Sequence, residues 1–185
     1  MKNRVYPTVC AALCLALALV LPFLTAQIPQ IGGMLCPMHL PVLLCGFVCG
    51  GGWGLIVGLI APLMRSVLFG MPAMFPGAAA MAVELGVYGG VSGALYRLLP
   101  KRIGFVYAAL GVAMAAGRIA WGVVRWIFAG IQGTGFAFQA FLAGAVTNAI
   151  PGIVLQIVLV PALVIALQRA GRIAGAAGSP KRPSR

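Results

Sequence analysis

The candidates for chemistry in this sequence are polar residues inside long apolar stretches. Arg118, Trp121 and Arg125 recur at i, i+3 and i+7, so a helix places all three on one face. Two guanidinium groups around an indole can hold an anionic or flat ligand by charge-assisted hydrogen bonds and stacking. The structural alternative is that one arginine pairs with Glu84 and the other reaches the lipid headgroups. Under the first interpretation, this helix face is the core of a binding site.

Five other residues join this face as candidate substrate contacts. Four of them also have a structural alternative. Glu84 can orient Arg118 instead of touching a ligand, and Asn148 can bond to a neighbouring helix. His39 is predicted at the outer interface, where a lone histidine is more often structural than ligand-binding. Met71 lies in a predicted loop and can simply pack on the bundle. The full set of predicted substrate contacts is Arg118, Trp121, Arg125, Glu84, Asn148, His39, Arg65 and Met71.

Catalysis is not predicted. Gly90-Val91-Ser92-Gly93 matches a serine-protease pattern, but the only histidine, His39, is predicted far from Ser92 and cannot act as its base. One carboxylate excludes a paired-acid mechanism, and no Gly-Lys-Ser/Thr phosphate loop is present. The cysteines, among which Cys45 and Cys49 share a helix face, have no acidic partner or second histidine for a metal site. We therefore expect no catalytic residue, metal or cofactor, and interpret the cysteines as packed small hydrophobic residues.

The composition decides what kind of fold positions these residues. Of the 185 residues, 62% are apolar and only 8% are charged, against roughly a quarter in ordinary soluble domains. The mean hydropathy is +1.08. The charged residues are thirteen Lys or Arg and one acid, and most of the cations flank apolar stretches, where the positive-inside rule puts them. An integral membrane protein is predicted, and the net charge of +12 does not indicate nucleic-acid binding.

The apolar stretches predict an all-α bundle of six transmembrane helices. They cover residues 5–24, 39–49, 53–69, 78–99, 105–128 and 138–167, and the second is short for a full span. Cations gather before the first helix, after the fourth and after the sixth, which predicts that both termini are cytoplasmic. Residues 1–168 form one membrane domain, and 169–185 form a basic, disordered tail. With this orientation the ionisable residues within the membrane lie in its outer half, which indicates a pocket that opens outward.

Several motifs together resemble the substrate-binding (S) components of energy-coupling factor (ECF) transporters. The resemblance covers about residues 5–168 and is nearest to the folate and pantothenate branch. It is carried by PMHLPVLLCGF at 37–47, GLIAPL at 58–63, GMP at 70–72, MAVEL at 81–85, and then Tyr88-Gly89, Gly117-Arg118 and QAF at 139–141.

The resemblance implies a subunit that captures a vitamin or precursor outside a bacterial cell. Such a subunit works in the plasma membrane with a membrane scaffold subunit and two ATPase subunits. In S components a small-residue face of the first helix packs on the scaffold, and Ala12 and Ala16 match it. Three outer-half arginines against one acid favour an anionic ligand, with pantothenate the first expectation and folate the second. The rival hypotheses are a stand-alone proton-coupled transporter or channel with Glu84 as proton carrier, and an assembly subunit without a ligand.

Overall fold

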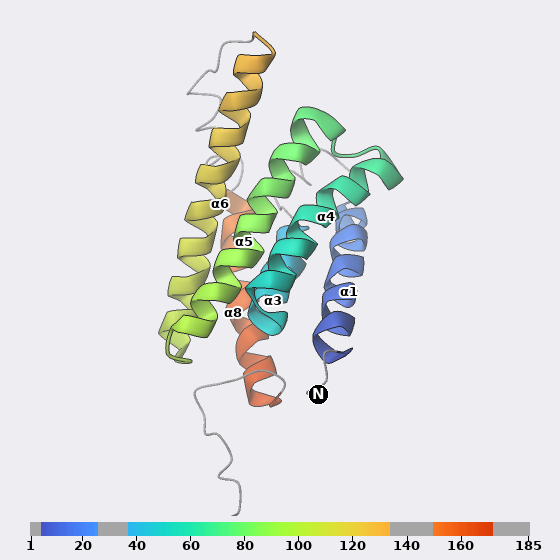
Figure 1. Cartoon of the computed structure of the whole chain (residues 1–185). Helices are drawn as coiled ribbons and strands as arrows, with labels where there is room; N and C mark the ends of the chain where they lie inside the picture. Colours follow the sequence, from blue (N-terminus) through green and yellow to red (C-terminus); the bar gives the residue numbers. More distant parts are fainter. Residues whose placement is uncertain (1–4, 26–36, 134–149, 172–185) are drawn as a thin grey trace, which may run out of the picture.

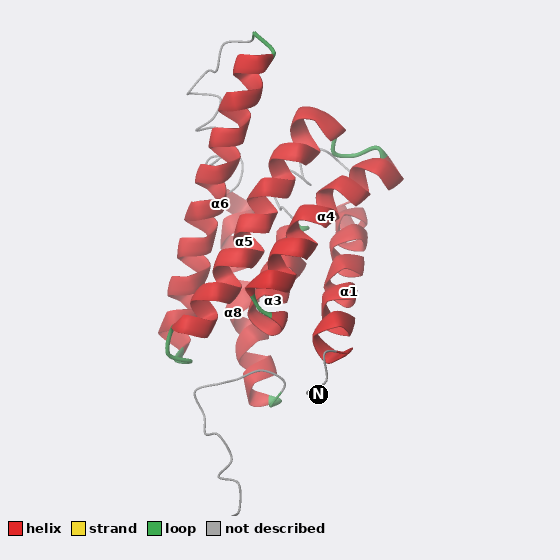
Figure 2. Ribbon diagram, viewed as in Figure 1, coloured by secondary structure: helices red, strands yellow, loops and turns green. Residues whose placement is uncertain are grey.

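The computed structural model describes residues 5–25, 37–133 and 150–171, and these are almost entirely helical (Figures 1 and 2). The elements in chain order are α1 (Val5–Val20), η1 (Leu21–Thr25), α3 (His39–Cys49), α4 (Gly51–Phe69), η2 (Met74–Ala78), α5 (Ala79–Leu98), α6 (Ile103–Ile131) and α8 (Ile150–Arg169). Within these described residues, five helical segments are long and apolar enough to cross a membrane, and α3 is a shorter apolar helix. The all-α membrane bundle predicted from the composition is confirmed.

Successive helices run in alternating directions through the bundle. In Figure 1, α1, α4 and α6 run from the lower end to the upper end, whereas α3, α5 and α8 run back. The start of α1, the α5–α6 connection and the end of α8 therefore share the lower end. Arg97, Lys101, Arg102 and Arg169 lie on these segments. This common end agrees with the predicted clustering of cations on one side of the membrane.

The helix α3 is too short to cross a bilayer. Its 11 residues span about 16 Å at 1.5 Å per residue, whereas the hydrocarbon layer is about 30 Å thick. It ends at Cys49 near the lower end of the bundle, and Gly50 has a positive φ of 96°, which starts the turn into α4. His39, its first residue, lies buried inside the bundle rather than exposed at its end.

Glycines let the central helices α4 and α5 touch backbone to backbone. A Cβ atom on Gly54 or Gly89 would collide with the backbone of the other residue, and one on Gly58 would collide with the Leu85 carbonyl group. Gly46 on α3 approaches the Gly89 carbonyl oxygen in the same way. Gly54 and Gly58, which have G-x-x-x-G spacing, thus serve packing inside the bundle, as small residues do between membrane helices. This seam fixes the positions of α3 and α5, which carry two residues of the candidate site.

The structure refines several predicted boundaries. The first helix is regular only to Val20 and continues as the 3₁₀ turn η1, and the fifth reaches Ile131 instead of ending at 128. The loop predicted at 70–77 is partly wrong, because η2 continues into α5 after an extended Phe75. Residues 138–149 of the sixth predicted helix and most of the predicted tail lie outside the described residues.

Candidate functional site

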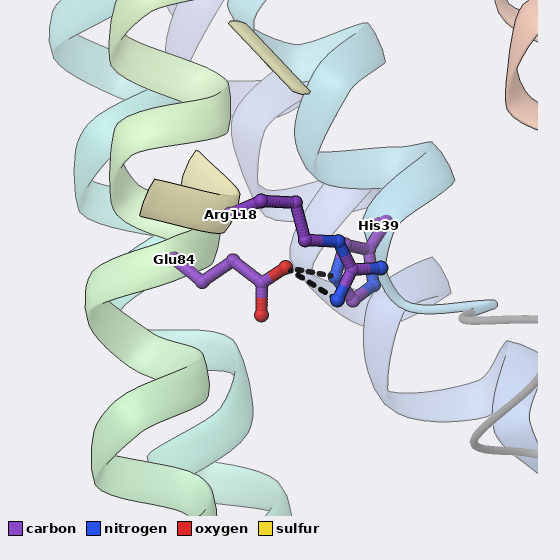
Figure 3. Close-up of polar contacts among 3 residues, drawn as sticks. All are labelled: His39, Glu84 and Arg118. Carbon is purple, nitrogen blue, oxygen red and sulfur yellow. Dashed lines mark ion pairs between the residues drawn. The ribbon is translucent and has the colours of Figure 1, made fainter. Parts of the chain in front are cut away.

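Three ionisable side chains from three helices meet inside the bundle. His39 is the first residue of α3, Glu84 lies in the second turn of α5, and Arg118 lies midway along α6. Glu84 Oε1 is 3.1 Å from Arg118 Nη1 and 3.5 Å from His39 Nε2 (Figure 3). We call these residues the polar triad. One carboxylate oxygen thus faces both basic side chains.

The polar triad is deeply buried in an apolar bundle. His39 is 1% exposed and Glu84 is 2% exposed, while Arg118 keeps 17% of its side chain accessible. A charged group at this depth is costly unless it is paired, and the Glu84–Arg118 ion pair supplies that pairing. Neither ring nitrogen of His39 has a hydrogen-bond partner within the described part of the chain. Because Nε2 already faces Glu84, Nδ1 is the atom of His39 that keeps unused hydrogen-bonding capacity among the described residues.

The height of the polar triad above the lower end of the bundle can be estimated from the rise per residue of an α-helix. Glu84 is 14 residues above the lower end of α5 and Arg118 is 15 residues above the lower end of α6, both roughly 21–23 Å. Measured from that end, this is beyond the midplane of a layer about 30 Å thick. With the predicted cytoplasmic orientation of the lower end, the triad occupies the outer half of the membrane.

Gly117 explains why Arg118 can reach Glu84. A Cβ atom on Gly117 would collide with the ring of Tyr88, so glycine lets α6 lie close to α5 at this level. The Tyr88 ring in turn contacts His39 edge to face, with ring centroids 5.2 Å apart. Tyr88 is fully buried, and its ring contacts both Gly117 of α6 and His39 of α3. The Gly117-Arg118 pair in the sequence thus combines a close approach with a charge.

The predicted face of α6 carries a second cation beyond the triad. Arg125 stacks over Trp121 with its guanidinium carbon 5.8 Å from the ring centroid, and both side chains are half-buried. The two arginines of this face have different environments, since Arg118 contacts Glu84 whereas Arg125 lies on an aromatic ring. The structural alternative for one arginine, pairing with Glu84, is therefore what the structure shows for Arg118.

Arg65 has a structural environment of its own. Its Nη1 donates a 2.7 Å hydrogen bond to the Leu19 carbonyl oxygen, and its guanidinium lies between the rings of Phe23 and Phe69 at 5.0 and 5.4 Å. The side chain is 4% exposed and ties α1 and η1 to the end of α4. These contacts do not join Arg65 to the polar triad.

The remaining predicted site residues are spread over the bundle. Met71 lies exposed in the connection between α4 and η2, and Asn148 lies outside the described residues. Ala12 and Ala16 are exposed on α1, whereas Ala11 and Ala18 are buried against the bundle. The α1 face predicted to meet a scaffold is thus free of contacts with the chain's own core.

Gln156 is a buried polar residue that the sequence reasoning missed. It lies on α8, is 1% exposed, and its Oε1 has no hydrogen-bond partner among the described residues. It is 13 residues above the lower end of α8, about 20 Å, a rise similar to that of Glu84 and Arg118 along their own helices. Val160 belongs to the hydrophobic cluster that also contains Leu40 and Tyr88, and Ile153 packs against that cluster, so Gln156 lies on the face of α8 that is buried in the bundle. The amide of Gln156 in the otherwise apolar run of residues 150–167 was the available indication.

The serine motif has a packing role. The Ser92 hydroxyl is fully buried and donates a 3.3 Å hydrogen bond to the Gly89 carbonyl oxygen of its own helix. It lies eight residues, about 12 Å, from Glu84 along α5, and His39 is at the Glu84 level. Ser92 and His39 are thus held at different depths.

Helices of membrane length around a buried ionic site define a multi-pass membrane protein with a polar site inside its bundle. The chain belongs to the family of substrate-specific components of ECF transporters, whose family model matches residues 8–164. No curated protein and no solved structure matches the chain. Family membership makes the chain a transporter subunit rather than an enzyme, working in a complex on a small-molecule substrate.

Proposed function

We propose that the chain captures an anionic vitamin or precursor for an ATP-driven importer in the bacterial plasma membrane. The observation that carries this is the polar triad, in which a partly accessible arginine and an unsatisfied histidine converge inside an apolar bundle. Arg125 and Trp121, one to two turns further along α6, extend the site toward the outer side. Pantothenate is the first candidate substrate and folate the second.

The partners follow from the same proposal. The exposed Ala12 and Ala16 on α1 form the face that meets the membrane scaffold subunit, and two ATPase subunits supply the energy. Small residues allow close helix approach in lipid, where apolar burial gives little net driving force. Glu84 orients Arg118 in this scheme, and it does not act as a proton carrier. Uptake into vesicles by this chain alone, driven by a proton gradient, would contradict the proposal.

A ligand panel tests the capture function directly. The chain, purified in detergent without partners, is expected to melt at a higher temperature with pantothenate and at an unchanged temperature with pantothenol, where an alcohol replaces the carboxylate. A ligand present at 100 times its Kd adds about 2.7 kcal/mol to the free energy of unfolding. Folate and neutral vitamins complete the panel. Equal stabilisation by pantothenate and pantothenol would contradict an anion-binding site.

Gln156 is expected to contribute a polar contact to the same site. The substitution Gln156→Leu should leave the free energy of unfolding unchanged or higher, because it removes a buried amide oxygen without a partner in the described chain. Ligand affinity should fall by about 0.5–1.5 kcal/mol, the typical net value of one hydrogen bond. Thermal unfolding and equilibrium ligand binding measure the two effects separately.

Gln168 provides the matched control on the same helix. Its Nε2 donates a 2.7 Å hydrogen bond to the Tyr96 hydroxyl at the lower end of the bundle. Gln168→Leu should therefore lower stability and leave ligand affinity unchanged. Unchanged affinity in a folded Gln156→Leu protein would remove Gln156 from the site.

A further inference from the structure

Four cysteines face one another where α1 packs against α3. Cys45 and Cys49 are buried in the cluster that α1 and α3 share with α4 and α5, and Cys10 and Cys14 pack against that cluster from α1. All four are free thiols. We call this group of Cys10, Cys14, Cys45 and Cys49 the thiol ladder.

The spacing of the thiol ladder matches the antiparallel packing of its two helices. Each helix contributes cysteines at i and i+4, which lie one above the other on one face. The Cys45 thiol makes hydrogen-bond contacts with the thiols of Cys14 and Cys49, and the Cys49 thiol contacts that of Cys10. Going up α1 therefore corresponds to going back along α3, so that Cys10 faces Cys49 and Cys14 faces Cys45.

Neither packing nor metal binding accounts for this arrangement. Alanine already serves the tight contacts of α1 at Ala11 and Ala18, so close packing does not require thiols at four facing positions. No group of three or more His, Cys, Asp or Glu among the described residues is arranged to hold a metal ion. Pairwise contact between thiols of two helices is what disulfide formation first requires.

We infer that the thiol ladder is an oxidation site at which disulfides Cys14–Cys45 and Cys10–Cys49 join α1 to α3. With a peroxide as oxidant, a thiolate of each pair attacks the O–O bond, becomes a sulfenic acid and releases hydroxide, which takes up the displaced proton as water. The second thiol then attacks the sulfenic sulfur and expels a second water. Each bond thus consumes two thiols and one peroxide and gives one disulfide and two waters. A dithiol reductant reverses the step by exchange.

The consequence of oxidation is a fixed position for α1. This helix carries the exposed Ala12 and Ala16, while α3 carries His39 at its other end. Two disulfides along the α1–α3 interface would prevent these helices from sliding or separating. They would cover neither the Ala12 and Ala16 face of α1 nor His39 on α3. The inference concerns the thiols alone and does not depend on the identity of the substrate.

Dithiodipyridine, an apolar oxidant that enters the detergent micelle, tests the pairing in the full chain carrying Cys36→Ser. This substitution removes the fifth cysteine of the sequence, which lies outside the described residues. A thiol displaces one thiopyridone and gains a pyridyl adduct, and a neighbouring thiol expels the second thiopyridone and leaves a disulfide without an adduct. The expected result is loss of all four thiols, an intact mass lower by four hydrogens, and proteolytic fragments of α1 linked to fragments of α3. Dithiothreitol should restore four free thiols.

The control removes one side of the thiol ladder. In the chain with Cys10→Ser, Cys14→Ser and Cys36→Ser, the two thiols of α3 should each keep a pyridyl adduct. Their facing partners are gone, and Cβ atoms at i and i+4 of one helix are about 5–6 Å apart, beyond the roughly 3.5–4.5 Å that a disulfide needs. Adduct-free loss of both thiols in this variant would overturn the cross-helix pairing. Retained adducts on the four-thiol chain, covalent dimers, or four thiols that do not react would overturn it as well.

Discussion

Replacing Arg118 by alanine is expected to weaken binding of the anionic ligand by about 1–3 kcal/mol, the value of a hydrogen bond to a charged group plus its desolvation. The same change should lower the free energy of unfolding by about 3 kcal/mol, because it leaves Glu84 buried without its ion-pair partner. The lower end of the range for buried pairs applies, since Arg118 is partly exposed. Thermal unfolding and equilibrium binding in detergent measure both losses.

A double variant separates the two roles of Arg118. In Arg118→Ala with Glu84→Gln, no uncompensated charge remains in the bundle, so much of the stability should return while the affinity stays low. Arg125→Ala is the comparison on the same face, and it should change stability little because Arg125 stacks on Trp121 without an acidic partner in the described structure. Unchanged affinity in folded Arg118→Ala would end the assignment of Arg118 to the site.

The second large effect is expected at the seam between α4 and α5. Gly89→Ala should lower the free energy of unfolding by about 1–3 kcal/mol or more, because the new methyl group meets backbone atoms of Gly54 that no rotamer change can move. The two helices must separate, and α5 must move with Glu84. The melting temperature and the yield of folded protein in detergent report the change.

Gly111 gives a control with the opposite sign. It is an exposed glycine inside α6, and a Cβ atom there would have no neighbour within 4 Å. Gly111→Ala should therefore raise stability by up to about 1 kcal/mol through helix propensity alone. Equal effects of the two substitutions would show that the backbone contact of the seam does not contribute to stability.

The sequence predicts the bundle well because apolar length and cation placement are local properties. The 39–49 helix has the predicted bounds. Contacts between helices were harder to predict from the sequence. His39 was placed at the outer interface, and that position is wrong, because the shortness of α3 puts its first residue beside Glu84 in the interior. Facing cysteines could not be paired from the sequence, since that requires the register of α1 against α3.

The sequence left open whether Glu84 pairs with Arg118, and the distance between them decides in favour of pairing. It also left Gln156 unnoticed, because one amide in an apolar helix is weak evidence until its burial is known. Whether Trp121, Arg125, Asn148 or Met71 touch a ligand stays a prediction. The local sequence pattern thus predicts the helices. The site could not be predicted in the same way, because it depends on which helices approach one another closely enough for their polar groups to meet.

The short α3 also has an electrostatic consequence. The amide groups in the first turn of a helix lack intrahelical acceptors, and they carry a partial positive charge of about half a unit. No side chain in the described part of the chain caps this end of α3, whose N-cap position is Met38. In most membrane helices this dipole end lies in water and is screened, but here it lies beside His39, where the surroundings have a low dielectric constant. The peptide backbone itself therefore favours negative charge at this depth, first that of Glu84 and then that of an anion entering the bundle.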